Sequence, residues 1–370
     1  MSKLFSPIGL RDLQLANRIM VAPMCQYSAV DGAANDWHFT HINTLALSGA
    51  SMFCIEATAV EAIGRITPGC LGLYNDAQEA ALKPILSSVR KYSKAAITVQ
   101  LAHAGRKASS HTPWDGGQLI PVAEGGWLPE GPSDVPHKAD EPPPLALDGA
   151  GLKRVVDAFA AAAKRAERLG LDAIEVHSAH GYLLHQFLSP ISNRRTDQYG
   201  GSLQNRIRFP LEVFDAVRAV FPQNKPVGVR VSCTDWVEGG WDINQTIEFA
   251  KELKKRNVDW IDASSGGVSP LQKIPLGPGY QVPFAQAVKE ATGITTMAVG
   301  LITEPKQAEE IVASGKADMV ALARGMLYDP RWGWHAAAEL GAEVSAPPQY
   351  WRSQPSSQKA LFGATTFGTR

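Results

Sequence analysis

Short apolar runs rich in β-branched residues alternate with longer amphipathic stretches along most of this chain, and this alternation constrains the fold more than any other feature. A sheet of parallel strands requires such a rhythm, because each helix returns the chain to the edge where the next strand begins. Eight such units in one chain favour a closed (β/α)8 TIM barrel of the α/β class over an open doubly wound sheet. The predicted strands are 17–24, 51–60, 95–102, 172–177, 226–232, 260–264, 295–300 and 318–323. The predicted helices that follow them are 36–47, 77–92, 152–169, 203–221, 243–257, 284–292, 305–314 and 332–340.

Two segments interrupt this rhythm. Residues 105–149 follow the third predicted strand, are rich in proline and glycine and have no helical period, so we expect a capping loop that forms a lid or a wall of the active site. Residues 346–352 contain two aromatic residues and an arginine, which are frequent anchors of protein interfaces. We predict one barrel domain over 1–344, including the capping loop, and a C-terminal arm and tail over 345–370. The arm docks on a partner subunit or folds on its own barrel.

Composition and charge exclude several classes of function. The sequence contains 36 Lys and Arg against 36 Asp and Glu, and no basic cluster alternates with aromatic residues, so nucleic acid is not an expected partner. No apolar run approaches the roughly 20 residues that span a bilayer, and the first residues do not resemble a signal peptide. We therefore expect a cytoplasmic protein without a membrane partner. The cysteines lack C-x-x-C spacing, which predicts free thiols at Cys25, Cys54, Cys70 and Cys233.

Two imidazoles and a phenol follow the fourth predicted strand. His177, His180 and Tyr182 stand in the run H-S-A-H-G-Y at the carboxyl end of that strand, where a barrel builds its active site. These side chains predict a site that binds and protonates a polarised oxygen compound. A metal-binding or purely structural histidine pair is the alternative, although no third metal ligand lies beside them in the sequence.

The other strand ends offer hydrogen-bonding groups rather than paired acids. Gly300 and Arg324 follow the last two strands, where barrels often bind phosphate; the alternative for Arg324 is a salt bridge on the rim. Arg230 would stabilise negative charge on an electron-accepting ring, or else pair with a carboxylate such as Asp172 or Glu175. Gln100 supplies both a donor and an acceptor. No carboxylate pair, G-x-S-x-G elbow or metal-ligand set is evident, which favours a bound organic cofactor.

Several motifs together resemble the Old Yellow Enzyme family of FMN-dependent ene-reductases, in its thermophilic-like bacterial branch. The resemblance extends in order from Leu4 to Arg352. Its motifs are P-M-C-Q-Y at 23–27, Q-L-A-H-A-G-R-K at 100–107, H-S-A-H-G-Y-L-L-H-Q-F-L-S-P at 177–190, N-R-R-T-D-Q-Y-G-G-S at 193–202 and P-G-Y-Q-V-P at 278–283.

The resemblance implies a role for each matching residue. FMN would bind at the mouth of the barrel domain, with NADPH or NADH as reductant and no metal. Tyr182 would donate a proton, and His177 and His180 would bind the substrate oxygen together with Tyr27. Arg352 would reach the site of a neighbouring subunit, which implies a homodimer or homotetramer. The implied cofactor contacts are Pro23, Met24, Cys25, Ala57, Gln100 and Arg230 around the isoalloxazine, and Gly300, Ala323 and Arg324 near the phosphate.

Two details of the resemblance concern single positions. Cys25 would tune the potential of the flavin. Relatives often have glycine before the phosphate-binding arginine, whereas Ala323 precedes Arg324 here, so a close approach of the phosphate is less assured.

The implied activity is that of an NADPH dehydrogenase or ene-reductase. Hydride would pass from NAD(P)H to FMN, and from N5 of reduced FMN to the β-carbon of an alkene conjugated to a carbonyl or nitro group. No G-x-G-x-x-G motif follows a strand, so the nicotinamide would visit the substrate pocket. The alternatives are a metal-dependent lyase or hydrolase, a flavin barrel with further redox domains, for which clustered cysteines are lacking, and a non-catalytic flavin-binding sensor.

Overall fold

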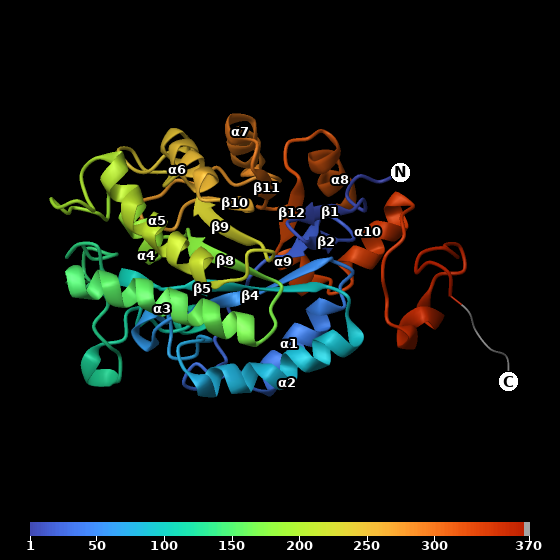
Figure 1. Ribbon diagram of the computed structural model, residues 1–370, viewed down its shortest axis with the longest axis horizontal. Helices are drawn as coiled ribbons and strands as arrows, with labels where there is room; N and C mark the ends of the chain where they lie inside the picture. Colours follow the sequence, from blue (N-terminus) through green and yellow to red (C-terminus); the bar gives the residue numbers. More distant parts are fainter. Residues whose placement is uncertain (366–370) are drawn as a thin grey trace.

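Eight parallel strands close into a barrel in the computed structural model, which describes residues 1–365 (Figure 1). This confirms the predicted (β/α)8 TIM barrel. Neighbouring strands pair in chain order, and the last strand pairs with the first. The barrel strands are β3 (Ile19–Val21), β4 (Met52–Ala59), β5 (Ala96–Ala102), β8 (Ala173–Ser178), β9 (Val227–Ser232), β10 (Trp260–Ser264), β11 (Thr295–Ala298) and β12 (Met319–Leu322).

Helices connect consecutive strands on the outside of the barrel. Their ends follow local sequence: Asn75 caps α2 by accepting a hydrogen bond from the Gln78 amide, and Gly293 ends α7 in the left-handed conformation. The crossover helices are α1 (Asp36–Ala46), α2 (Asp76–Tyr92), α3 (Gly149–Arg168), α5 (Leu203–Val220), α6 (Ile243–Lys255), α7 (Val282–Thr292) and α8 (Pro305–Ala313), and α10 (Trp332–Leu340) follows the last strand. No helix within residues 1–365 is both long enough and apolar enough to cross a membrane.

Some short elements were not predicted. A hairpin of β1 (Ile8–Leu10) and β2 (Leu13–Leu15) precedes the barrel, and two short helices, α4 (Leu183–Leu188) and α9 (Arg324–Tyr328), follow β8 and β12. The first barrel strand was predicted too long, because only Ile19–Val21 are paired. Pro23 has no amide hydrogen for the sheet, and the chain from there to Tyr27 turns across the mouth, with a positive φ of 52° at Tyr27.

The interior of the barrel is filled by large side chains near its amino end. Met52, Met297 and Met319 pack there around the fully buried indole of Trp260, and Leu10 and Leu15 of the hairpin join the same cluster. Gly228 makes room for the indole, since a Cβ at this position would lie 2.0 Å from its Cε2 atom. The interior is therefore a packed core below the mouth and not a channel.

The predicted capping loop is an ordered segment between β5 and α3. It contains the short 3-10 helices η2 (Gly105–Lys107), η3 (Pro113–Asp115) and η4 (Val122–Glu124), and a ladder of β6 (Glu130–Gly131) and β7 (Leu145–Ala146). Arg106 anchors the loop by donating to the carbonyls of Val135, Pro136 and Val268. Side-chain and backbone hydrogen bonds thus order a segment that has no periodic pattern.

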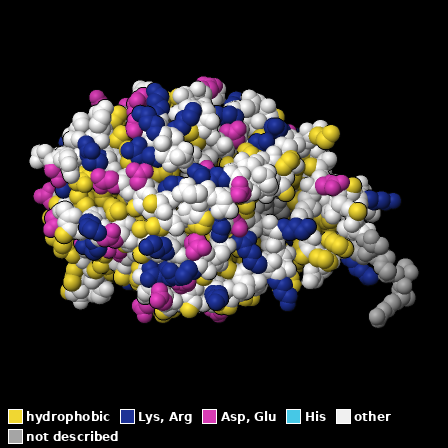
Figure 2. Space-filling view, viewed as in Figure 1, with side chains coloured by type: hydrophobic (Ala, Val, Ile, Leu, Met, Phe, Trp, Pro, Cys, Tyr) yellow, Lys and Arg dark blue, Asp and Glu magenta, His cyan; other side chains and the backbone are white. Residues whose placement is uncertain are grey.

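The C-terminal arm packs against α10 of its own chain. The ring of Trp334 lies 5.0 Å from that of Phe362 and 5.7 Å from that of Tyr350, which belongs to η5 (Pro348–Ser353). Residues 366–370 of the predicted tail lie outside the described residues. The space-filling view shows acidic and basic side chains mixed over the visible face, in keeping with the formal charge of zero (Figure 2).

Candidate active site

His177, His180 and Tyr182 meet at the carboxyl end of β8. The His177 ring centroid lies 5.1 Å from that of His180 and 5.2 Å from that of Tyr182, and both contacts are edge-on. The structure therefore brings together the three residues that were predicted to bind and protonate a substrate.

The backbone around His180 is held by contacts with three other segments. Its φ of 59° is in the left-handed region, its amide donates to Ser232 Oγ at 2.8 Å, and its carbonyl accepts from Lys107 Nζ at 3.0 Å. Gly181 follows, and a Cβ there would lie 2.0 Å from the Gly267 carbonyl oxygen. The loop after β10 thus fixes where the His180 ring points.

Both imidazoles are neutral at ordinary pH. Burial and the Arg230 guanidinium lower the pKa of His177 and of His180 well below the usual value. His180 Nε2 lies 2.7 Å from Ser264 Oγ, whereas the buried Nδ1 of His177 has no hydrogen-bond partner among residues 1–365. Since an unpaired buried nitrogen is costly, this atom is one that a bound ligand would satisfy.

Tyr182 keeps its phenol proton, because burial raises its pKa well above the usual value. Lys107 Nζ lies 4.9 Å from the centre of the Tyr182 ring and also donates to the Gly267 carbonyl at 3.1 Å. Burial lowers the pKa of this lysine to about 8. The sequence reasoning did not assign a role to Lys107, although the position directly after Gly105 and Arg106 in the motif at the end of β5 was a signal.

The segment from Pro23 to Tyr27 forms another side of the mouth. The Gln26 amide donates to Glu56 Oε2 at 2.9 Å, which holds the segment against the end of β4. Burial raises the pKa of Cys25 and of Tyr27, so both side chains stay protonated. The Tyr27 ring lies 5.6 Å from that of Trp114 in the capping loop. The loop therefore forms a wall beside this part of the mouth.

Gln100, Arg230 and Asp262 are buried in the barrel, and Arg230 is the register partner of His177. Arg230 Nε is 3.2 Å from Asp262 Oδ2, and Gln100 Nε2 donates to Glu175 at 2.8 Å. The carboxylate that pairs with Arg230 is thus neither Asp172 nor Glu175, the two that the sequence suggested. Asp172 instead pairs with Arg90 at 2.7 Å near the start of β8, and the pairing with Asp262 follows from the register of β9 and β10.

The residues expected near a phosphate lie after β11 and β12. Gly300 has φ 111°, and Ala323 directly precedes Arg324, the exposed first residue of α9. Within residues 1–365 Arg324 makes no ion pair, so the rim salt bridge considered as its alternative role is not formed. Its guanidinium is available to an anion.

A group with spacing suited to a metal ion lies outside these residues. Ligand atoms of Glu61, His103 and Glu130 lie within 4.8 Å of one another. Arg154 pairs with both glutamates, His103 Nδ1 accepts the Gly105 amide, and His103 Nε2 lies 3.3 Å from Glu61 Oε2. The side chains of this group thus already partner one another.

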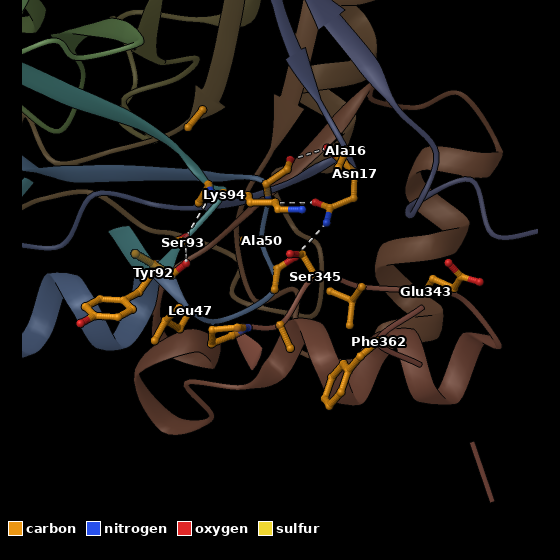
Figure 3. Close-up of a pocket in the computed structure, with 18 of the residues that line it drawn as sticks. Ala16, Asn17, Leu47, Ala50, Tyr92, Ser93, Lys94, Glu343, Ser345 and Phe362 are labelled. Atoms are coloured by element: carbon orange, nitrogen blue, oxygen red, sulfur yellow. Dashed lines mark hydrogen bonds between the residues drawn. The ribbon is translucent and has the colours of Figure 1, made fainter. Parts of the chain in front are cut away.

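Cavities lie at both ends of the barrel. One of about 160 Å³ borders Tyr27 and Lys107 below the capping loop. A larger one of about 720 Å³ lies at the amino ends of the strands, between the barrel and the arm, where Asn17, Ser345 and Phe362 line it (Figure 3). Trp351 borders this larger cavity as well, so the arm lies at the end of the barrel opposite His177.

The comparisons with known proteins agree with this geometry. A family model described as the NADH:flavin oxidoreductase / NADH oxidase family matches residues 3–343. An NADPH dehydrogenase of Listeria innocua is 43% identical over 355 residues, which cover 95% of this chain and 99% of that protein. An NADH:flavin oxidoreductase, FG08077, of Gibberella zeae is 44% identical over 366 residues, which cover 94% of this chain and 88% of that protein.

Solved structures of morphinone reductase superpose on most of this chain. Morphinone reductase superposes with a TM-score of 0.76 at 29% identity, over 98% of this chain and 94% of that one. A complex of morphinone reductase with tetrahydroNAD superposes with a TM-score of 0.74, also at 29% identity, over 93% of this chain and 92% of that one.

Proposed function

Because this chain belongs to the NADH:flavin oxidoreductase / NADH oxidase family, and within it to the Old Yellow Enzyme family, we propose that it reduces the C=C bond of alkenes conjugated to a carbonyl or nitro group. Membership makes it an oxidoreductase that uses FMN and a nicotinamide reductant. The observation that carries the choice of substrate is the cluster of two neutral imidazoles and a protonated phenol at the mouth.

The mouth of the barrel has groups that fit FMN. The buried guanidinium of Arg230, which pairs with Asp262 through Nε, lies beside His177 in the register of β8 and β9, and the exposed Arg324 suits a phosphate. The chemistry supplied by bound FMN is hydride transfer, first from NAD(P)H and then to the β-carbon of the alkene. The residues that would hold FMN in the barrel domain 1–344 are Pro23, Met24, Cys25, Ala57, Gln100, Arg230, Gly300, Ala323 and Arg324.

The substrate oxygen would be bound by His177 and His180. A neutral imidazole donates through one N–H, and such donors stabilise charge that develops on the oxygen during reduction. Tyr27 adds a further hydroxyl. Tyr182 is the proton donor for the α-carbon, because its raised pKa keeps the phenol protonated. Lys107 holds the His180 carbonyl and lies over the Tyr182 ring, which keeps the two groups together.

Cys25 and Arg352 have supporting roles in this proposal. The half-buried Cys25 stays a thiol and tunes the potential of the flavin. Arg352 is exposed on an arm at the far end of its own barrel, so a contact with substrate requires the site of a neighbouring subunit. We therefore propose a homodimer, or a homotetramer built from such dimers, in which residues from 345 onward lie at the interface.

An anaerobic absorption experiment tests the proposed function. The flavin band of the purified protein is recorded before and after addition of NADPH, and again after addition of 2-cyclohexenone. We expect bleaching by NADPH and recovery with the enone. Bleaching without recovery would reject the reduction of activated alkenes, and a protein that does not retain FMN would reject the whole proposal.

A further inference from the structure

The interior of the barrel contains two carboxylates and one cation next to His177. Glu175 on β8 and Asp262 on β10 have exposed fractions of 0%, and Arg230 on β9 has 6%. Arg230 pairs with Asp262, and His177 is neutral. The group thus has a net negative charge when both carboxylates are ionised, and an unbalanced buried charge is costly.

Glu175 is bound by two N–H donors. Gln100 Nε2 donates to Oε1 at 2.8 Å, and Trp260 Nε1 donates to Oε2 at 3.2 Å. Because a carboxylate only accepts, the Gln100 side chain must present its nitrogen to Glu175. The Gln100 carbonyl oxygen is then left for a ligand at the mouth, beside the second N–H of the same amide. An ionised Glu175 therefore fixes the orientation of the Gln100 amide and leaves its oxygen as an acceptor there.

The charge on Glu175 depends on the groups that face it. Burial and the Asp262 carboxylate raise its pKa, while Arg230 and the two hydrogen bonds lower it, and the balance is a pKa of about 7. Cys54 on β4 also faces this group, and burial keeps it an uncharged thiol. A change of charge at the mouth will therefore shift the protonation of Glu175 near neutral pH.

We propose that Glu175 is a positioning residue that fixes Gln100 as a hydrogen-bond acceptor for the FMN ring, and that it takes up one proton when the ring is reduced. Hydride transfer brings two electrons and one proton to the isoalloxazine and leaves one additional negative charge there. A proton from solvent that binds a Glu175 oxygen balances this charge, and it is released when hydride leaves for the alkene. This inference rests on the FMN site of the proposed function.

A potentiometric titration tests the proton uptake without any turnover. The FMN-loaded protein is reduced with dithionite and mediators at a series of pH values, and the slope of the midpoint potential against pH gives the protons bound per two electrons. Below about pH 7, Glu175 is protonated in both states, and we expect one proton. Above that pH we expect two protons in the wild type, until the pKa of Glu175 in the reduced protein is reached.

The Glu175→Gln variant keeps the size of the side chain and removes the charge. We expect one proton per two electrons at all pH values for this variant. The matched control is Asp172→Asn, which removes a carboxylate from the opposite end of β8 and keeps the slope of the wild type. The Asp262→Asn variant removes the charge that raises the pKa of Glu175, so the change of slope moves to lower pH.

Two outcomes would overturn the proton uptake: Glu175→Gln keeps the slope of the wild type, or Asp262→Asn leaves the change of slope where it was. If the wild-type protein reduces 2-cyclohexenone but binds one proton per two electrons at every pH, this inference is overturned and the proposed function is not. A protein that does not retain FMN overturns the proposed function instead.

Binding of FMN to the apoprotein tests the positioning role. The side-chain amide of the Glu175→Gln variant has one acceptor oxygen in place of two. Either the Gln100 side chain must therefore turn, or one of the two donors, Gln100 or Trp260, loses its acceptor. We expect about fivefold weaker FMN binding, because a lost hydrogen bond costs about 1 kcal/mol. If the effect acts through Gln100, Glu175→Gln has no further effect in a Gln100→Ala background. Additive losses in the double variant would overturn the positioning role.

Discussion

A buried imidazole beside a guanidinium stays uncharged at a pH where an exposed imidazole would be partly protonated. Arg230 and burial keep His177 and His180 uncharged, so each ring offers one N–H donor and one acceptor. A donor already fixed in place costs no reorganisation when charge develops on a substrate oxygen. The hydrogen bond between His180 Nε2 and Ser264 Oγ, and the hydrogen bond from Lys107 to the His180 carbonyl, supply that fixed geometry for His180.

The His177→Ala variant should lower turnover with 2-cyclohexenone by about 10²–10³, the usual cost of one such donor. The FMN content serves as the control, since the substitution leaves Arg230 and Gln100 in place. Steady-state kinetics measures the effect. The proposed binding of the substrate oxygen fails if His177→Ala and His180→Ala both keep the turnover of the wild type.

Tyr182 leads to a prediction about pH. The Tyr182→Phe variant should slow reoxidation of the flavin by the enone by about 10²-fold, the lower end for a general acid. Because the pKa of Tyr182 is raised, the wild-type rate should not fall through loss of the phenol proton as pH approaches 10. Stopped-flow reoxidation across pH measures both effects. A full rate in Tyr182→Phe would show that water supplies the proton.

The three predicted site residues are close together in the sequence, whereas the residues that hold the site in place and were not predicted come from distant strands. His177, His180 and Tyr182 are local in sequence, so the end of one predicted strand was enough to bring them together. His180 and Ser264 are separated by 84 positions, and Gln100 and Glu175 by 75. Such contacts depend on the register between parallel strands, which are buried on both faces and read as near-continuous apolar runs, so their pattern does not determine the register.

At the scale of elements, the segment from β8 to α4 is held by a buried pair. His185 and Asp235 have exposed fractions of 0%, and His185 Nε2 lies 2.9 Å from Asp235 Oδ1. The Gly181 amide donates to Nδ1 of the same ring, so Nε2 is the nitrogen that carries hydrogen. Ser189 and the Trp241 amide donate to the other carboxylate oxygen. The turn that contains His180 and Tyr182 is thus tied to the loop after β9.

The Asp235→Asn variant should lower the free energy of unfolding by about 3 kcal/mol, since it leaves buried donors without a charged acceptor. Burial raises the pKa of Asp235, but His185 and the hydrogen bonds outweigh it and lower the pKa below its usual value. The stabilisation is therefore present above about pH 4 and is lost as pH falls through the pKa of the folded state.

Urea unfolding at neutral and acid pH measures the effect of Asp235→Asn. The control is Asp157→Asn, which removes a similar charge from an exposed pair with Lys153 and should cost less than about 0.5 kcal/mol. Equal losses in the two variants would contradict the role given to the buried pair.

Element type could be predicted better than element length. The crossover helices are long enough to show a period, whereas α4 and α9 have six and five residues, too few for one. The capping loop was identified by its proline and glycine content, but its order comes from side chains such as Arg106, which reach distant carbonyls.

At the scale of the whole molecule, the barrel and the arm differ in how well the sequence determines them. The closed barrel was predicted because every strand repeats the same pattern, and closure follows from the number of units. The arm has no repeat, and its composition fitted both docking on a partner and folding on its own barrel. In the structure it packs on α10 through Trp334 and Phe362, while the exposed Arg352 lies far from the mouth of its own barrel.

Complementation between two impaired variants tests whether Arg352 acts on a neighbouring subunit. We expect Arg352→Ala alone to lose about tenfold or more in kcat/KM, the cost of a charged hydrogen bond, and His177→Ala to be more strongly impaired. If each site takes Arg352 from the other chain, a dimer of one Arg352→Ala chain and one His177→Ala chain has one complete site. That site combines the native His177 of the first chain with the native Arg352 of the second. Random exchange of subunits would then complete about a quarter of all sites. Activity of the mixture well above the mean of the separate variants is the expected result. If Arg352 served its own barrel, every site would lack one of the two residues, and mixing would recover nothing.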